Sequence, residues 1–273
     1  MTTDWRVVTV AGVGLIGGSF ALALRKAGFE GRIIGVSSRA TIDAALARGA
    51  IDEALPLAEA AAQSDVVYLA QPIENILATL ETIDDMVRPG TLITDAGSTK
   101  QAIVERARAM VHRGRFVGGH PMAGKEARGV EAAEAGLFQG RNYVLTGTDA
   151  VLEMWLGKIG ARIVKLEAAE HDRLVALVSH LPQLLSTALA ALIAASPESA
   201  RVAGPAAADL TRLALSPYDI WRDIFSTNAV EIDRALGAAI AQLETLRENL
   251  LSRPDMQATF ERAAQAASKL RQS

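Results

Sequence analysis

The chain has 273 residues, of which 50% are hydrophobic and 22% charged; this balance is typical of a soluble globular protein, and the length favours two domains. Its net charge of −3, its pI of about 5.9 and its aromatic content of 4% exclude the basic, aromatic-rich surface of a nucleic-acid-binding protein. The absence of cysteine excludes disulfides, thiolate catalysis and thiolate metal sites, fits a reducing compartment, and leaves no metal site to predict.

We expect a cytoplasmic α/β protein without a signal peptide. Met1–Val10 lacks the basic region, apolar stretch and small-residue cleavage site of a secretory signal peptide. From there to Lys165, short β-rich runs alternate with helical segments, a pattern that predicts a parallel sheet covered by helices on both faces. The expected strands are Arg6–Val10, Arg32–Val36, Val66–Leu69, Leu92–Asp95, Phe116–Gly118, Tyr143–Thr146 and Arg162–Lys165. The last two flank a helical run at Ala150–Ile159 and are expected to extend the same sheet.

Strand signals end at Lys165, and helical periodicity continues from there between cap signals. We therefore predict an α/β domain over residues 1–165 and an all-helical domain over residues 166–273. Ser196-Pro197 and Ser216-Pro217 each predict a helix start, because serine is a good N-cap and proline suits the first helical position.

Two apolar features of the helical half bear on its surroundings. Leu181–Ala195 is interrupted by Pro182 and Gln183, so it does not provide the run of about 18 apolar residues that would span a bilayer, and no membrane partner is predicted. A second stripe recurs at helical spacing and must be covered, either by the chain's own core or by a second copy in a homodimer. It consists of Ile232, Leu236, Ile240, Leu243 and Leu250.

A glycine motif directly follows the first expected strand and precedes an apolar helical segment. Gly12-Val13-Gly14-Leu15-Ile16-Gly17 matches the pattern G-x-G-x-x-G of dinucleotide-binding folds. In such folds the first glycine permits a tight turn, the second lets the backbone approach the pyrophosphate, and the third allows close helix–strand packing. The order therefore predicts a Rossmann-type doubly wound sheet with a dinucleotide site; the alternative is a plain glycine turn. The cofactor-binding residues expected here are Gly12, Gly14, Leu15, Ile16 and Gly17.

The end of the second expected strand bears on which dinucleotide binds. Sites for NAD usually have a carboxylate there, on the adenosine ribose, whereas this chain has Ser37. Ser38, Arg39 and Thr41 follow, and hydroxyls with a guanidinium suit a 2′-phosphate. NADP is therefore the preferred cofactor. If Arg39 is only a solvated charge, NAD would bind without the carboxylate.

Further motifs follow strands or interrupt helices. Gly118–Gly124 places His120 in a glycine-flanked loop after an expected strand, at the sheet edge where α/β enzymes bind ligands. Asp95–Lys100 has the same position after its own strand, so Ser98 could both cap the next helix and reach the site. The helical half adds His180, Gln183, Arg212 and Trp221 in S-H-L-P-Q, D-L-T-R and W-x-D-I-x-x-x-N segments.

In this order, and with the opening G-x-G-L-I-G-G-S at Gly12–Ser19, these motifs resemble the prephenate and arogenate dehydrogenase family of tyrosine biosynthesis. The resemblance runs from the first strand to about Asn249. It implies a Rossmann domain joined to a helical dimerisation domain, and hence a homodimer. It also implies oxidative decarboxylation of a small-molecule substrate, arogenate and/or prephenate, with hydride transfer to NADP or NAD.

The resemblance implies roles for individual side chains. His120 would accept a hydrogen bond from the substrate hydroxyl as a base or polariser, and Ser98 would orient His120 and touch the substrate. Arg212 would bind the ring carboxylate through its guanidinium. His180 and Gln183 either line the pocket or pack within the protein.

For some residues a structural role is the first interpretation. Trp221 is more often core than a shelf for the substrate. His112 and His171 lie among charged helical residues, so we expect both to be solvated. Lys100 either supports Ser98 or is an exposed helix charge.

Two other functions remain open on the sequence alone. A β-hydroxyacid dehydrogenase or ketopantoate reductase would share the layout but depend on a catalytic lysine in the helical half. A non-catalytic NADP sensor would need the glycine motif but not His120, Ser98 and Arg212 together. The sequence also leaves open the choice between prephenate and arogenate, which differ in a keto or amino group.

Overall fold

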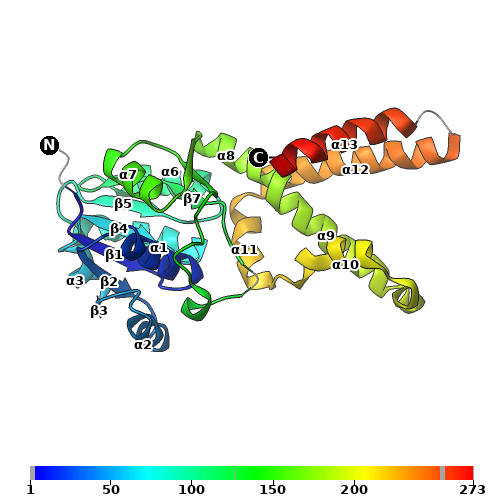
Figure 1. Ribbon diagram of the computed structural model, residues 1–273. Helices are drawn as coiled ribbons and strands as arrows, with labels where there is room; N and C mark the ends of the chain where they lie inside the picture. Colours follow the sequence, from blue (N-terminus) through cyan, green and yellow to red (C-terminus); the bar gives the residue numbers. More distant parts are fainter. Residues whose placement is uncertain (1–3, 126, 253–255, 273) are drawn as a thin grey trace.

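The computed structural model describes residues 4–125, 127–252 and 256–272. Figure 1 shows a sheet with helices on both faces, from which an elongated group of helices leads away. Residues 1–3 belong to the segment Met1–Val10, which lacks the features of a signal peptide. They lie outside the described residues. The architecture is the predicted one: a Rossmann-type sheet followed by a helical region.

The main sheet has six parallel strands in the order β3-β2-β1-β4-β5-β6. The chain order reverses between β1 and β4, which makes the carboxyl ends of these strands the usual place for a ligand. The strands are β1 (Val7–Ala11), β2 (Arg32–Val36), β3 (Glu53–Ala54), β4 (Val66–Leu69), β5 (Leu92–Asp95) and β6 (Arg115–Val117). The helices between them are α1 (Leu15–Lys26), α2 (Arg39–Ala47), α3 (Leu57–Ala61), α4 (Ile73–Leu80), α5 (Ile83–Met86) and α6 (Gln101–Met110).

Two hydrophobic cores lie on opposite faces of this sheet, because successive side chains of a strand point to opposite faces. Val66 and Tyr68 of β4 belong to one core, and Val67 and Leu69 belong to the other. Burial on both faces explains why the strands are nearly continuous apolar runs in the sequence.

The expected extension of the main sheet is wrong. β7 (Gly119–Pro121), β8 (Asn142–Leu145) and β9 (Arg162–Lys165) form a separate three-stranded sheet in the order β7-β8-β9. β7 runs antiparallel to β8, and β8 runs parallel to β9 across α7 (Ala150–Lys158). The prediction missed β7 because the glycines of this segment indicate a loop.

Most other strand predictions are confirmed. Those for β2, β4, β5 and β9 have the observed bounds, and those for β1, β6 and β8 are shifted by one residue. The two-residue strand β3 was missed. The last strand ends at Lys165, where strand signals stop, while the division into domains at residues 165 and 166 stays a prediction.

The helical region begins with one long, continuous helix. α8 (Ala168–Val175) passes through a π-helical turn (Ala176–His180) into α9 (Leu181–Ala194). Pro182 and Gln183, which interrupt the apolar run in the sequence, thus lie within a continuous helix. Proline has no N–H for the carbonyl four residues back, and the wider turn just before it accommodates that loss. By length and composition alone, the helix over Ala168–Ala194 could cross a membrane, although a long helix of a soluble protein passes the same test.

The two expected serine caps are also corrected. Ser196 precedes a short 3₁₀ helix, Pro197–Val202, without a side-chain cap hydrogen bond. Ser216 lies outside α11 (Tyr218–Thr227), and its Oγ accepts a hydrogen bond of 2.9 Å from the indole N–H of Trp221. The remaining helices are α10 (Pro205–Thr211), α12 (Ala229–Ser252) and α13 (Met256–Gln272).

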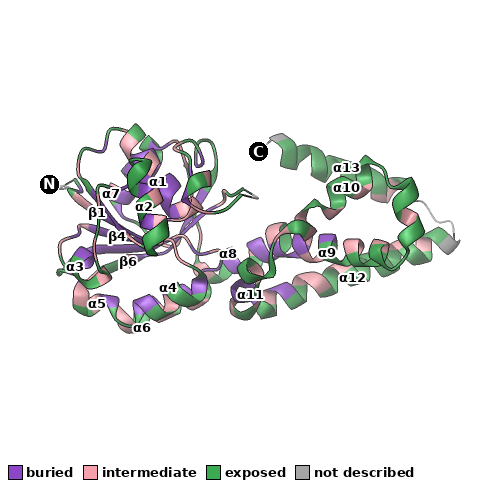
Figure 2. Cartoon of the chain, turned by 90° about the horizontal axis from the view of Figure 1, so that it is seen from below, coloured by how far each residue is buried: buried purple, intermediate pink, exposed green. Residues whose placement is uncertain are grey.

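The apolar stripe of α12 is covered only at its start. Ile232 is buried in the core that contains Ala176. Farther along, Ile240, Leu243 and Leu250 are exposed by 49%, 56% and 69% in the single chain. Figure 2 shows this exposure along α12 and α13. Among the described residues, the intrachain core therefore covers one end of the stripe.

Candidate active site

The glycine motif forms a tight turn between β1 and α1. Gly12 has φ +92°, and a Cβ there would lie 2.5 Å from the carbonyl oxygen of Ala70, so both conformation and space require glycine. A Cβ on Gly17 would overlap the carbonyl oxygen of Gly12. By contrast, nothing lies within 4 Å of a Cβ built on Gly14, the N-cap of α1. The open space and the uncapped helix end fit the pyrophosphate of a dinucleotide.

The region beyond β2 matches the place predicted for the adenosine end of the cofactor. Ser37 and Arg39 line a hollow of about 680 Å³ there. Arg39 is 89% exposed and pairs with Asp43 at 3.0 Å. Ser38 caps α2 by accepting a bond from the backbone N–H of Thr41, and the two hydroxyls lie 2.9 Å apart.

A cavity of about 380 Å³ lies between the carboxyl ends of the main-sheet strands and α11. Leu15 and Ile16 of the glycine motif line it together with Ser98, so the turn and the predicted substrate side share one cavity. Arg128 joins its two sides, because its guanidinium donates bonds of 3.0 and 2.9 Å to the Asp219 carboxylate of α11.

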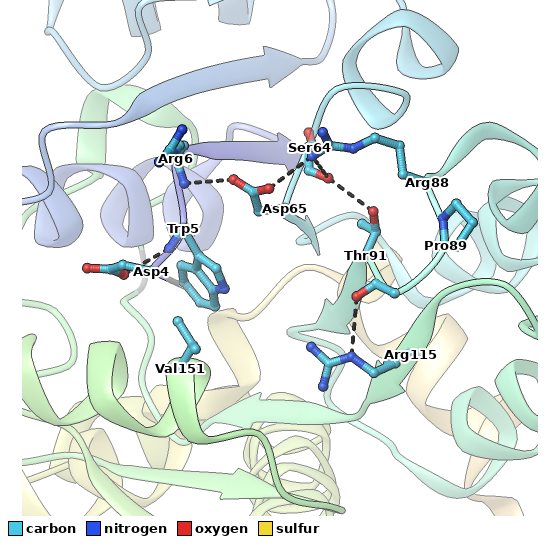
Figure 3. Close-up of a pocket in the computed structure, with 11 residues that line it drawn as sticks. Asp4, Trp5, Arg6, Ser64, Asp65, Arg88, Pro89, Thr91, Arg115 and Val151 are labelled. Atoms are coloured by element: carbon cyan, nitrogen blue, oxygen red, sulfur yellow. Dashed lines mark hydrogen bonds and ion pairs between the residues drawn. The ribbon is translucent and has the colours of Figure 1, made fainter. Parts of the chain in front are cut away.

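Another hollow, drawn in Figure 3, lies at the opposite, amino-terminal edge of the sheet. Its polar groups bond to one another: Asp65 accepts from the backbone N–H of Arg6 and pairs with Arg88. Thr91 donates to the carbonyl oxygen of Ser64 at 3.0 Å. Since α/β sheets bind ligands at their carboxyl ends, we interpret these bonds as structural.

His120 lies on β7 rather than in the predicted loop. The preceding residue, Gly119, donates its backbone N–H to Asp95 Oδ1 at 3.1 Å, and a Cβ on Gly119 would lie 2.6 Å from the carbonyl oxygen of Asp95. Glycine therefore lets β7 approach the end of β5, where Ala96, Gly97 and Ser98 line the cavity. His120 itself is 9% exposed.

A chain of hydrogen bonds runs from His120 into the helical region. Its Nδ1 lies 2.8 Å from Nε2 of His171, and Nδ1 of His171 lies 2.7 Å from Oδ1 of Asp172. Asp172 also accepts the backbone N–H groups of Lys100, at 2.7 Å, and Gln101, at 2.9 Å. The prediction that His171 is solvated is wrong, because the residue is fully buried.

Lys100 is likewise fully buried, which overturns its interpretation as an exposed charge. Its ammonium forms an ion pair with Asp95, whose carboxylate also accepts the N–H of Gly97 at 2.8 Å. Burial lowers the pKa of Lys100, although Asp95 opposes that shift. The pair fixes the end of β5 beside β7.

The surroundings keep His120 neutral. Burial, followed by the nearby His171, Lys100 and His180, holds the pKa of His120 well below 6.5. Its imidazole therefore has one unprotonated nitrogen at neutral pH. Burial lowers the pKa of His180 to about 4, with Asp172 opposing and His171 adding to the shift.

Ser98 lines the cavity but does not cap α6 as expected. That helix begins at Gln101, and its first N–H groups bond to Asp172 instead. Sequence analysis thus missed Asp172, and it left open whether Lys100 supports Ser98 or is exposed. A charged residue in a predicted helix is expected to be solvated, so the sequence gave no sign that these side chains are buried.

The predicted residues of the helical region occupy different environments. His180 is buried, with its ring edge-on to Trp221 at 6.0 Å between centroids, and Trp221 is half-buried. Gln183 is 5% exposed, and its Oε1 has no hydrogen-bond partner among the described residues. Arg212 is exposed at the start of a short 3₁₀ helix (Arg212–Leu215), and neither it nor His120 lines the cavity of Ser98.

Two family models match the chain. "Prephenate dehydrogenase, nucleotide-binding domain" matches residues 20–170, and "Prephenate dehydrogenase, dimerization domain" matches residues 167–264. The chain belongs to the prephenate dehydrogenase family. The second match also suggests that family members associate through the helical region in which the α12 stripe is uncovered.

Individual relatives agree with this family. A prephenate dehydrogenase of Lactococcus lactis is 36% identical over 81% of this chain and 64% of its own length, so the chain spans about two thirds of that relative. A prephenate dehydrogenase structure from A. aeolicus, in complex with hydroxyphenyl propionate and NAD⁺, has a TM-score of 0.90 at 28% identity and covers 100% of this chain and 99% of its own. A Synechocystis arogenate dehydrogenase structure has a TM-score of 0.81 at 30% identity, covering 97% and 99%.

Two glycine substitutions should separate folding from cofactor binding. Gly17→Ala should lower the free energy of unfolding by about 1–3 kcal/mol, the usual cost of overpacking, because the new methyl would overlap Gly12. Gly14→Ala should unfold near the wild-type temperature but bind NADP and NAD more weakly, since its methyl enters the open space above α1. Thermal unfolding and cofactor titration measure the two effects. Wild-type cofactor affinity in Gly14→Ala would contradict the phosphate site.

Proposed function

We propose that the chain catalyses the oxidative decarboxylation of arogenate or prephenate in tyrosine biosynthesis, with NADP as the preferred hydride acceptor. The observation that carries the proposal is the buried imidazole of His120 beside the segment after β5 that supplies Ser98 to the cavity, where burial holds the His120 pKa well below 6.5. Family membership supports the reaction class. A neutral imidazole is the proton acceptor that oxidation of a hydroxyl requires.

In the proposed site His120 accepts the proton of the substrate hydroxyl, and Ser98 hydrogen-bonds the substrate and orients His120. Arg212 binds the ring carboxylate, because a planar guanidinium matches two carboxylate oxygens. A bound oxidised nicotinamide would supply the hydride acceptor. Gly14 would leave the helix end open to the pyrophosphate of the dinucleotide, while Gly12 and Gly17 shape the turn that places this end.

The side chain of the substrate would be read by His180, Gln183 and Trp221. Because Oε1 of the buried Gln183 has no hydrogen-bond partner among the described residues, it favours a ligand that brings a donor. The ammonium of arogenate is such a donor, whereas the keto oxygen of prephenate is not. This difference favours arogenate.

The preference for NADP is supported by the hollow beyond β2. Arg39 lines this hollow, and among the described residues its guanidinium pairs only with Asp43. After β2, the chain has Ser37 where NAD sites usually have a carboxylate. A 2′-phosphate would gain a charge-assisted bond from this guanidinium.

The open alternatives fit less well. A hydroxyacid dehydrogenase would need a catalytic lysine in the helical region, whereas the buried Lys100 precedes α6 and is paired with Asp95. A sensor would have no need for a buried imidazole held neutral beside the cavity. Homodimerisation through α12 is part of our proposal, and the cytoplasmic location stays a prediction.

Turnover of the two substrates tests the proposed reaction. Purified protein should oxidise arogenate or prephenate in the presence of NADP or NAD, with a higher kcat/KM for arogenate because of Gln183. Reduced-cofactor absorbance measures the rate with each pair. Normal cofactor binding without turnover of either substrate would refute the proposed function, and a higher kcat/KM for prephenate would refute only the substrate preference.

Substitutions of His120 and Arg212 should affect different kinetic parameters, kcat for His120 and KM for Arg212. His120→Asn should lower kcat by about 10²–10⁴, the usual contribution of a positioned acid or base, with cofactor affinity unchanged. Arg212→Ala should mainly raise the KM for the substrate, because it removes a binding contact. Steady-state kinetics with both variants distinguishes the effects. An unchanged kcat in the first or an unchanged KM in the second would reassign that residue.

Arg39→Ala tests cofactor choice. Loss of a charge-assisted bond to the 2′-phosphate should reduce the NADP-to-NAD ratio of kcat/KM by about ten- to hundredfold. Asp43→Asn is the matched control, because it removes only the partner of Arg39 and should keep or raise the ratio. A ratio that is the same in Arg39→Ala and wild type would leave Arg39 as a solvated charge.

A further inference from the structure

The hydrogen-bond chain from Asp172 to His120 determines where protons lie in the site. We infer that His171 and Asp172 are positioning residues that hold His120 in the tautomer protonated on Nδ1, leaving a lone pair on Nε2 for the substrate hydroxyl. The inference rests on the proposed function for the role of Nε2. For a singly protonated His171, the tautomer follows from the hydrogen-bond geometry.

The first step concerns Asp172. Its Oδ1 accepts the backbone N–H of Lys100 and its Oδ2 accepts that of Gln101. A backbone N–H can only donate, so both carboxylate oxygens act as acceptors. The remaining partner of Oδ1 is Nδ1 of His171, at 2.7 Å. This nitrogen must therefore carry the proton.

The second step transfers this polarity to His120. When His171 carries this single proton, its Nε2 has a lone pair and acts as an acceptor. Its partner, Nδ1 of His120 at 2.8 Å, must then donate. Nε2 of His120 is left unprotonated, and it has no hydrogen-bond partner among the described residues.

Burial makes the reverse arrangement unfavourable. His171 is 0% and Asp172 is 1% exposed, so solvent does not replace a missing hydrogen bond. The other tautomer of His171 would place a lone pair against the Asp172 carboxylate. It would also direct an Nε2 proton at His120, which would then need to be protonated on the nitrogen that faces the substrate. The two buried residues thus select one proton arrangement.

The same residues assist proton acceptance. In the proposed reaction the hydroxyl O–H bond breaks, its proton forms an Nε2–H bond on His120, and the oxygen's electron pair becomes part of the new carbonyl. The hydride leaves the carbon for the oxidised nicotinamide. The resulting imidazolium is destabilised by burial and by Lys100. Its Nδ1–H bond to His171, with the Asp172 charge behind it, opposes that cost, as an aspartate does in Ser-His-Asp triads.

Nitrogen NMR of the ¹⁵N-labelled protein tests the tautomer without turnover. Ring nitrogens with and without a proton differ in shift, and substitutions assign the signals of the four histidines. Above the His120 pKa, we expect protonated Nδ1 and unprotonated Nε2 on both His120 and His171. The opposite tautomer of either ring, or a doubly protonated His171, in the wild-type protein would overturn the inference. This result does not depend on which substrate, if any, is turned over.

His171→Phe tests the kinetic consequence. It keeps an aromatic ring but removes both hydrogen bonds, so kcat should fall by about ten- to hundredfold, less than for loss of the base, with cofactor affinity unchanged. His171→Gln should recover part of kcat, because its amide oxygen is able to accept from Nδ1–H of His120. His112→Phe, at an exposed histidine, is the matched control and should behave as wild type.

These variants also separate a positioning role from a structural one. His171→Phe should shift His120 toward a mixture of tautomers in the NMR spectrum while keeping normal cofactor binding. Wild-type kcat in that variant, or equal losses in Phe and Gln with the His120 tautomer unchanged, would overturn the inference. If the variants fold poorly, the wild-type spectrum still decides the tautomer.

Discussion

The buried carboxylate of Asp172 is the constraint on which the site depends. A carboxylate that is 1% exposed is stable only if its oxygens are satisfied, and here two backbone N–H groups and one imidazole satisfy them. Because Asp172 belongs to α8 and its backbone partners begin α6, one side chain joins the helical region to the loop that carries Ser98. The geometry of that loop is therefore tied to the position of α8.

A second buried charge pair acts on His120 in the opposite direction. Lys100 and Asp95 fix the end of β5 and the approach of β7, which places a positive charge near the imidazole. In the proposed reaction, that charge favours the neutral ring before proton transfer but penalises the imidazolium that forms. The chain through His171 to Asp172 compensates for the second effect. One region thus combines a group that keeps the base free with another that supports the charge it acquires.

Features with local causes could be predicted from the sequence, whereas those set by tertiary packing could not. Apolar runs identify β2, β4 and β5, and the glycine spacing identifies the turn at Gly12–Gly17. Both features depend on the residue types within the segment itself: apolar residues for a buried strand, and glycine for a positive φ. His171 has the charged neighbours of a solvated residue, and only the packing of α8 against α6 shows that it is buried. The glycines before His120 indicate a turn, but they allow a strand to pass close to Asp95.

The two ends of the proposed substrate site differ in burial: His120 is buried, whereas Arg212 is exposed in the single chain. The proton-accepting end is rigid: His120 and His171 are buried and bonded to each other. The carboxylate-binding end rests on Arg212, which is exposed on a short 3₁₀ helix packed against α9 through a bond from the Ala214 N–H to Ser186 Oγ. The uncovered stripe of α12 belongs to the same helical region. The buried, hydrogen-bonded end thus holds the group that must position a proton within a few tenths of an ångström. The exposed end needs less exact geometry, because the attraction between Arg212 and a carboxylate acts over longer distances.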